Sequence, residues 1–194
     1  MRLPASFFGL IMVLFTSTVA AAHPHVFIDN RVTLVFAETT FTGFRAEWRF
    51  DEIFTADLLA QYDADADGQF NAAESERVRG ETLPNLKAFR YFTYLSVNGS
   101  DLGVLEPADF KADIVDGAVR FMFTYQLAQP VDPARDKLAL SIYDREYYVE
   151  VMMAANDPVT IEGGGGCQAT IADDPANAYY GGFVVPQAIS VSCP

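Results

Sequence analysis

Residues 63–74 read DADADGQFNAAE, and this acidic segment limits the possible folds of the chain more than any other feature. Three aspartates stand at alternate positions, and a glycine, an apolar residue and a glutamate follow them. Carboxylates held this close together repel one another and raise one another's pKa. A fold that gathers them in one short loop therefore favours a bound cation, which would offset the repulsion.

The spacing in this segment matches the calcium-binding loop of an EF-hand. Aspartates at alternate positions of a coiled loop converge on one centre, and Ca²⁺ takes about six to eight oxygen ligands. Gly68 permits the sharp turn, and Phe70 is the apolar anchor to the core. A solvated acidic loop is the alternative, but it would not require this spacing. The expected ligands are Asp63, Asp65, Asp67, Gln69 (through its backbone carbonyl), Asn71 and Glu74.

Helical patterns lie on both sides of the loop. Phe54, Leu58 and Tyr62 recur every four residues, and Asp51 is placed to cap that helix. Residues 72–89 resume the helical pattern. EF-hands usually work in pairs and this sequence has one such loop, so we expect Ca²⁺ to act as a structural staple rather than as a signal.

Most of the remaining chain has the alternating apolar pattern of strands. Asn98-Gly99 and Asp116-Gly117 predict tight hairpins, because these residues tolerate positive φ. Residues 144–146 look like a further turn that pairs the strands on either side. The expected strands span about residues 25–38, 41–50, 91–97, 110–115, 118–128, 137–144 and 147–153, with weaker candidates at 159–162 and 188–193.

These patterns together predict an α+β fold that is mainly antiparallel β and sandwich-like, with an EF-hand-like helix–loop–helix inserted at about residues 51–90. Residues 1–22 have the pattern of a secretory signal peptide, with Arg2, an apolar run over 7–15 and small residues at Ala20 and Ala22. We expect an exported single domain of residues 23–194. Its apolar stretches are all shorter than the roughly 20 residues of a membrane span.

The formal net charge of −13 argues against nucleic acid and anionic membrane surfaces as partners and favours cations. The two cysteines, Cys167 and Cys193, predict a disulfide in an exported protein. A two-thiol metal site is the alternative, but neither cysteine has a second Cys or His close to it in the sequence.

The two histidines of the chain stand together at His23 and His25. Cleavage after Ala22 would give His23 a free α-amine, so that its amine and imidazole could chelate one ion, with His25 and Asp29 on the same face of an extended segment. Nitrogen ligands suit Ni²⁺, Co²⁺, Cu²⁺ and Zn²⁺. The alternative is a pair of exposed residues at a frayed terminus.

Four segments also resemble a bacterial periplasmic family of unknown function: AHPHVFID (22–29), FDEIFTADLLAQYDADADG (50–68), FRYFTYLSVNG (89–99) and YDREYYVEV (143–151). Members of that family are described as a periplasmic component of an ABC-type transport system. They are found beside, or fused to, a membrane permease of the nickel/cobalt (NicO) type. The resemblance implies a periplasmic location and a membrane metal permease as partner.

Two functions are compatible with these features. The first is a periplasmic metal-binding accessory protein of a nickel/cobalt-type transport system, with a structural calcium site. The second is a calcium-stapled interaction module with no transition-metal role. We expect no enzymatic activity, because the sequence offers no third histidine for a copper brace and no Ser-His-Asp or Cys-His set.

Overall fold

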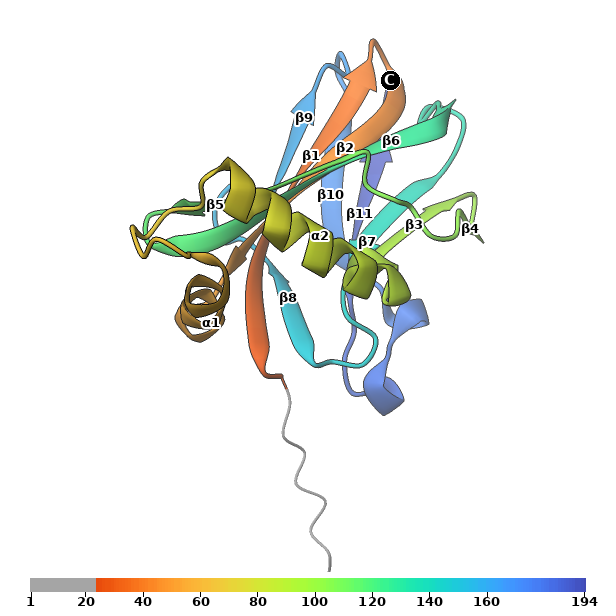
Figure 1. Cartoon of the computed structure of the whole chain (residues 1–194). Helices are drawn as coiled ribbons and strands as arrows, with labels where there is room; N and C mark the ends of the chain where they lie inside the picture. The colour runs from red at the N-terminus through yellow and green to blue at the C-terminus, as the bar shows by residue number, and fades with distance from the viewer. Residues whose placement is uncertain (1–23) are drawn as a thin grey trace, which may run out of the picture.

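Two β-sheets and a pair of helices make up the fold of residues 24–194, which are the residues that the computed structural model describes (Figure 1). The expected signal peptide and His23 lie outside them. Most strand pairings are antiparallel, and the helix pair is inserted between the second and third strands. The α+β, sandwich-like fold predicted from the sequence is therefore confirmed.

The first sheet is built around two long strands that pair antiparallel and alternate between buried and exposed side chains. Two shorter strands run parallel to the first of them and share its other edge. The sequence patterns did not predict these parallel pairings. The strands in order across the sheet are β5 (Asp109–Val115), β6 (Ala118–Val131), β2 (Thr40–Phe50), β1 (Val26–Ala37) and β8 (Val149–Met153), with β9 (Val159–Glu162) also paired to β1.

The second sheet consists of β10 (Gln168–Asp173), β11 (Gln187–Ser192), β7 (Leu138–Ile142), β3 (Thr93–Val97) and β4 (Ser100–Asp101), in that order. The predicted pairing across residues 144–146 is wrong, because β7 belongs to this sheet and β8 to the first one. Asp144 is buried between them and accepts hydrogen bonds from the backbone N–H groups of Glu146, Tyr148 and Val149 at 3.0, 3.0 and 3.1 Å. These hydrogen bonds hold the segment that passes from β7 in the second sheet to β8 in the first, where the sequence predicted a hairpin.

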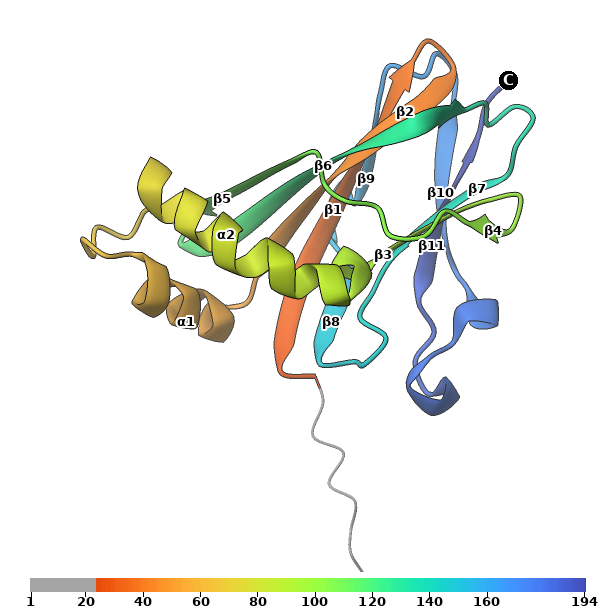
Figure 2. The same cartoon turned by 45° about the vertical axis from the view of Figure 1, so that its right-hand side comes forward.

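The helix pair is α1 (Glu52–Tyr62) and α2 (Ala72–Ala88). α1 packs against β6 at one end of the first sheet, and α2 runs from β5 across to the segment just before β3 (Figures 1 and 2). The backbone N–H of Val119 in β6 donates to Thr55 Oγ1 in α1 at 3.2 Å. The hydroxyl of Ser75 in α2 donates to the carbonyl of Ala112 in β5 at 3.0 Å. Three short 3-10 helices complete the fold: η1 (Arg90–Phe92), η2 (Pro175–Asn177) and η3 (Tyr180–Gly182).

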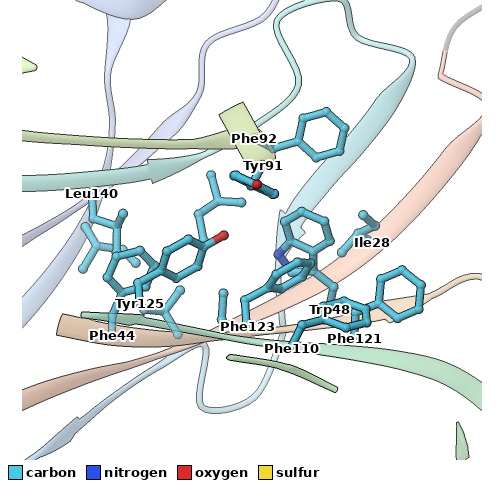
Figure 3. Close-up of a cluster of buried hydrophobic side chains, with 14 of the residues drawn as sticks. Ile28, Phe44, Trp48, Tyr91, Phe92, Phe110, Phe121, Phe123, Tyr125 and Leu140 are labelled. Atoms are coloured by element: carbon cyan, nitrogen blue, oxygen red, sulfur yellow. The ribbon is translucent and has the colours of Figure 1, made fainter. Parts of the chain in front are cut away.

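Aromatic side chains of β2 and β6 fill the core beneath the second sheet (Figure 3). Trp48 lies with its ring 4.4 Å from that of Phe123, and Phe44 stacks on Tyr125 at 4.5 Å between ring centroids. Trp48 also stacks on Phe92, which precedes β3. Burial of these large rings supplies the main hydrophobic stabilisation of the two-sheet packing.

Both predicted hairpin turns are confirmed. Asn98 and Gly99 have φ angles of 53° and 78°, and Asp116 and Gly117 have 50° and 74°, which is the positive-φ pair that a tight hairpin requires. The turn between β1 and β2 is made by Glu38 and Thr39. Each turn sets the register of the strands that it joins.

The predicted disulfide between Cys167 and Cys193 is present, with the two Cα atoms 4.1 Å apart. It stands next to the first ladder pair of β10 and β11, Gln168 and Ser192, and so closes the end of that pair. None of the helices within residues 24–194 is both long and apolar enough to cross a membrane. The disulfide fits an exported protein.

Candidate metal centre in the acidic loop

The acidic loop lies between the end of α1 at Tyr62 and the start of α2 at Ala72. Asp51 caps α1 by accepting hydrogen bonds from the backbone N–H groups of Ile53 and Phe54, as the sequence predicts. Asn71 caps α2 in the same way, through Ala73 and Glu74. Both residues are N-caps, so they fix where each helix begins. The loop is bounded on one side by the end of α1, where the backbone N–H of Asp63 donates to the carbonyl of Leu59, and on the other by the Asn71 cap.

The carboxylates of Asp63, Asp65 and Asp67 converge, with one oxygen of each lying within 4.8 Å of the others. Backbone N–H groups inside the loop orient them: Gly68 donates to Asp63 at 2.9 Å, and Gln69 donates to Asp67 at 2.7 Å. A carboxylate oxygen has two lone pairs, so these bonds leave acceptor capacity toward the centre. This set of oxygen donors fits a hard cation such as Ca²⁺.

Two residues with positive φ bend the backbone around the centre. Ala66 has φ of 56° and Gly68 has φ of 77°. Glycine adopts this conformation without a steric cost, which accounts for Gly68 at the predicted sharp turn. The bends bring alternate side chains to one side of the loop. Phe70, the predicted anchor, is partly buried against the hydrophobic core.

Glu74 is 7% exposed and is the most enclosed carboxylate of the loop. Its Oε1 accepts from the backbone N–H of Ala64 at 2.8 Å, and its Oε2 accepts from that of Asn71 at 2.9 Å. The side-chain oxygen of Asn71 serves as the cap of α2. The structure therefore gathers the three aspartates. Glu74 lies outside that cluster, and the contacts of Glu74 and Asn71 stabilise the loop itself.

The loop carries an excess of negative charge. None of the ion pairs formed within residues 24–194 includes Asp63, Asp65, Asp67 or Glu74. The pKa of Asp65 is raised by partial desolvation and, further, by the charges of Asp67 and Glu74. A raised carboxyl pKa means that the ionised form of Asp65 is disfavoured, and a bound cation would stabilise the ionised form.

The second predicted site begins at His23, which lies outside the described residues, and continues with His25 and Asp29. His25 is exposed, donates its backbone N–H to the carbonyl of Tyr148 at 2.9 Å, and has its ring 4.9 Å from that of Tyr148. Asp29 is exposed on the same face of β1, as predicted. Four residues of an extended strand span about 13 Å, and Phe27 stands between the two side chains on that face.

This separation is long for two ligands of one ion. An ion bound by the His23 amine and imidazole together with His25 would lie at the first residues of β1, and Asp29 would then act at longer range. We therefore place the geometric support for a metal centre in the acidic loop.

Comparison with known proteins identifies the family. Residues 8–179 match the family described as "Protein of unknown function (DUF1007)". An uncharacterized 15.5 kDa protein in the trpE 3′ region of Spirochaeta aurantia is 33% identical over 132 residues, which cover 66% of this chain and 93% of the relative. An uncharacterized protein of Haemophilus influenzae is 26% identical over 154 residues, or 78% of this chain and 73% of the relative. The chain therefore belongs to the DUF1007 family, in agreement with the resemblance to a family of unknown function.

Proposed function

We propose that this protein is an exported binding module in which Ca²⁺ at residues 63–74 joins the end of α1 to the start of α2. The observation that carries the proposal is the convergence of Asp63, Asp65 and Asp67 in a loop without an ion-pair partner among the described residues. The ion would take further oxygens from Glu74 and from the backbone carbonyl of Gln69.

Calcium at this position is a structural element of the fold rather than a signal. The helix pair covers one end of the first sheet through the Thr55 and Ser75 hydrogen bonds, so an ion that fixes the loop also fixes this cover. Extracellular calcium modules bind at about 10⁻⁴ to 10⁻³ M, which suits an exported protein. We place the function in binding rather than in catalysis.

Calorimetric titration and thermal unfolding of the mature protein test the proposal. Millimolar Ca²⁺ should raise Tm, because a ligand that binds the native state alone stabilises it by mass action. Asp65→Asn should lose this rise, since it removes one ligand charge from an exposed side chain while keeping an acceptor for the Asp67 N–H. Asp57→Asn is the matched control, because Asp57 is an exposed aspartate of α1 outside the loop. Unchanged Tm with Ca²⁺ in the unmutated protein would refute the proposal.

A second candidate function is that of a periplasmic accessory protein for a membrane permease of the nickel/cobalt type. The exposed position of His25 at the start of β1 favours it, as does the resemblance described above. His23 and His25 would supply nitrogen ligands for Ni²⁺, Co²⁺, Cu²⁺ or Zn²⁺, and Asp29, farther along β1, would act at longer range. This function uses residues separate from the calcium loop, so the two can be tested independently.

A further inference from the structure

A cavity of about 310 Å³ lies between the edge of the first sheet and the segment that leads into β11. The loop before β8 and the residues that follow η3 form its walls, and β1 contributes Asn30. Figures 1 and 2 show β8 and the blue segment of η2 and η3 at the end of the molecule away from the β1–β2 turn. The cavity is distant in the fold from the acidic loop, and none of its lining residues belongs to that loop.

The charge in the lining is negative. Glu150 and Asp173 contribute carboxylates, and the lining contains no lysine, arginine or histidine from the part of the chain that the structure describes. Burial raises the pKa of the Tyr179 phenol, and the nearby negative groups, which include Asp144 and Glu150, raise it further. The carboxylates of the lining therefore favour a positively charged occupant over a negative one, although Arg145 interacts with Tyr143 from outside the lining.

Three tyrosine rings form an aromatic wall. The rings of Tyr143 and Tyr179 are 4.8 Å apart and tilted by 35°, and those of Tyr147 and Tyr179 are 6.1 Å apart and nearly perpendicular. All three residues line the cavity. Tyr143 also stacks on Tyr94 at 4.4 Å between ring centroids, so the rings of Tyr147 and Tyr179 are the ones that would attract a cation.

A buried acceptor also lines the cavity and has no hydrogen-bond partner among residues 24–194. Asn30 is 1% exposed, and its Oδ1 accepts no hydrogen bond in the structure. Its Nδ2 donates to the sulfur of Met153 at 3.6 Å, which is a weak bond. An unsatisfied buried acceptor is costly, and a ligand that brings an N–H donor would satisfy it. This acceptor points to a ligand independently of the negative charge.

From these features we propose that the cavity binds a small organic ammonium ion, with its ammonium group against the tyrosine rings, an N–H group directed at Asn30 and its charge balanced by Glu150. A metal ion fits less well, because among the described residues the only cluster of three metal-ligating side chains is the one formed by Asp63, Asp65 and Asp67. The volume stands at the lower end of small-molecule pockets, which typically measure about 300–1,000 Å³, so the ligand should be small.

Titration of the mature ¹⁵N-labelled protein with n-butylammonium chloride at constant Ca²⁺ and 150 mM salt tests this proposal by NMR. The neutral comparison is 1-butanol, which has the same number of heavy atoms and can still donate to Asn30. We expect n-butylammonium to shift the amides of the cavity walls saturably, and 1-butanol to bind at least about tenfold more weakly.

Two variants, each with a matched control variant, locate the site. Glu150→Gln, at an edge strand, should weaken n-butylammonium binding by about tenfold, while Glu38→Gln removes the same charge at the exposed β1–β2 turn and should leave binding unchanged. Tyr179→Leu should weaken binding by about five- to tenfold, and Tyr179→Phe, which keeps the ring, by less than about twofold.

Several results would overturn the proposal: no saturable shifts, equal binding of 1-butanol, or equal weakening by Glu150→Gln and Glu38→Gln. The last result would mean that the net charge of the whole protein attracts the cation. Because the cavity and the acidic loop share no residues, loss of one function leaves the other testable.

Discussion

The carboxylate of Glu74 accepts a hydrogen bond from the backbone N–H of Ala64, ten residues earlier in the chain, at 2.8 Å. Its second oxygen accepts from Asn71 at 2.9 Å, so one buried side chain joins both ends of the acidic loop. Glu74 therefore has two roles. It holds the shape of the loop without an ion, and we propose that it also binds Ca²⁺.

Glu74→Gln separates these roles. A glutamine amide has a single acceptor oxygen, so one of the two part-buried N–H groups would face an NH₂ donor. We expect the variant to lose about 1–3 kcal/mol in the free energy of unfolding even in EDTA, and to lose the calcium-induced rise in Tm as well. Asp65→Asn, by contrast, should lose only the calcium effect. Urea unfolding in EDTA checks both, and a fully stable Glu74→Gln would contradict the loop-closing role.

The ion pair between Asp113 and Arg120 should account for part of the acid sensitivity of the fold. Hydrogen bonds from Arg120, at 2.8 and 2.9 Å, hold the pKa of Asp113 below its ordinary value. A lowered carboxyl pKa contributes stability that is present above the unfolded-state pKa and is lost as pH falls through the folded-state value. Asp113→Asn should therefore cost about 1–2 kcal/mol at pH 7 and progressively less below about pH 5. Urea unfolding across pH 3–7 measures this, and a pH-independent difference would count against the ion pair as its source.

Transition-metal binding should depend on the first residues of the mature chain. The double variant His23→Ala/His25→Ala should lose binding of Ni²⁺, Co²⁺, Cu²⁺ and Zn²⁺, while its calcium-induced rise in Tm remains. The unmutated protein should release these ions below about pH 6, because imidazole must be neutral to bind them. Copper should bind tightest in vitro whatever the physiological ion is. Titration calorimetry measures this binding. Equal binding by the double variant and the unmutated protein would refute the proposed accessory-protein function.

The disulfide should stabilise the edge of the second sheet. Replacing both cysteines with serine, Cys167→Ser/Cys193→Ser, should cost roughly 3 kcal/mol. Hydrogen exchange should increase most in β10 and β11, since the bridge closes the end of that strand pair. An equal increase in the hydrogen-exchange rate throughout the protein would show instead that this edge opens only on global unfolding.

Gly43 is required by the close approach of two strands. A Cβ placed at Gly43 would lie 2.1 Å from the carbonyl oxygen of Tyr125 in β6, so Gly43→Ala must displace that strand. We expect a loss of about 1–3 kcal/mol. Gly80→Ala is the control, because a Cβ at this position in α2 meets no atom within 4 Å and alanine favours the helix by about 0.5–1 kcal/mol. Thermal unfolding of the two variants should therefore move Tm in opposite directions.

Features coded by a few adjacent residues could be predicted from the sequence. The turns at Asn98-Gly99 and Asp116-Gly117 form where predicted, because positive φ is a property of those residues themselves. The helix–loop–helix around residues 63–74 follows from caps and spacing within one short segment. The two cysteines sufficed for the disulfide, since each had one possible partner in the chain.

Features that join distant segments were decided by the tertiary structure alone. β1 pairs in parallel with β8 and β9, more than one hundred residues later, and no local pattern distinguishes that partner from a neighbouring strand. Residues 144–146 have the pattern of a hairpin turn, but β7 and β8 belong to different sheets, and only the pairing of each strand with its distant partners decides this. Asn30 is an ordinary alternating residue in the sequence. Only the packing of distant segments buries it beside Met153, places it in the lining of a cavity and leaves its oxygen without a hydrogen-bond partner among residues 24–194.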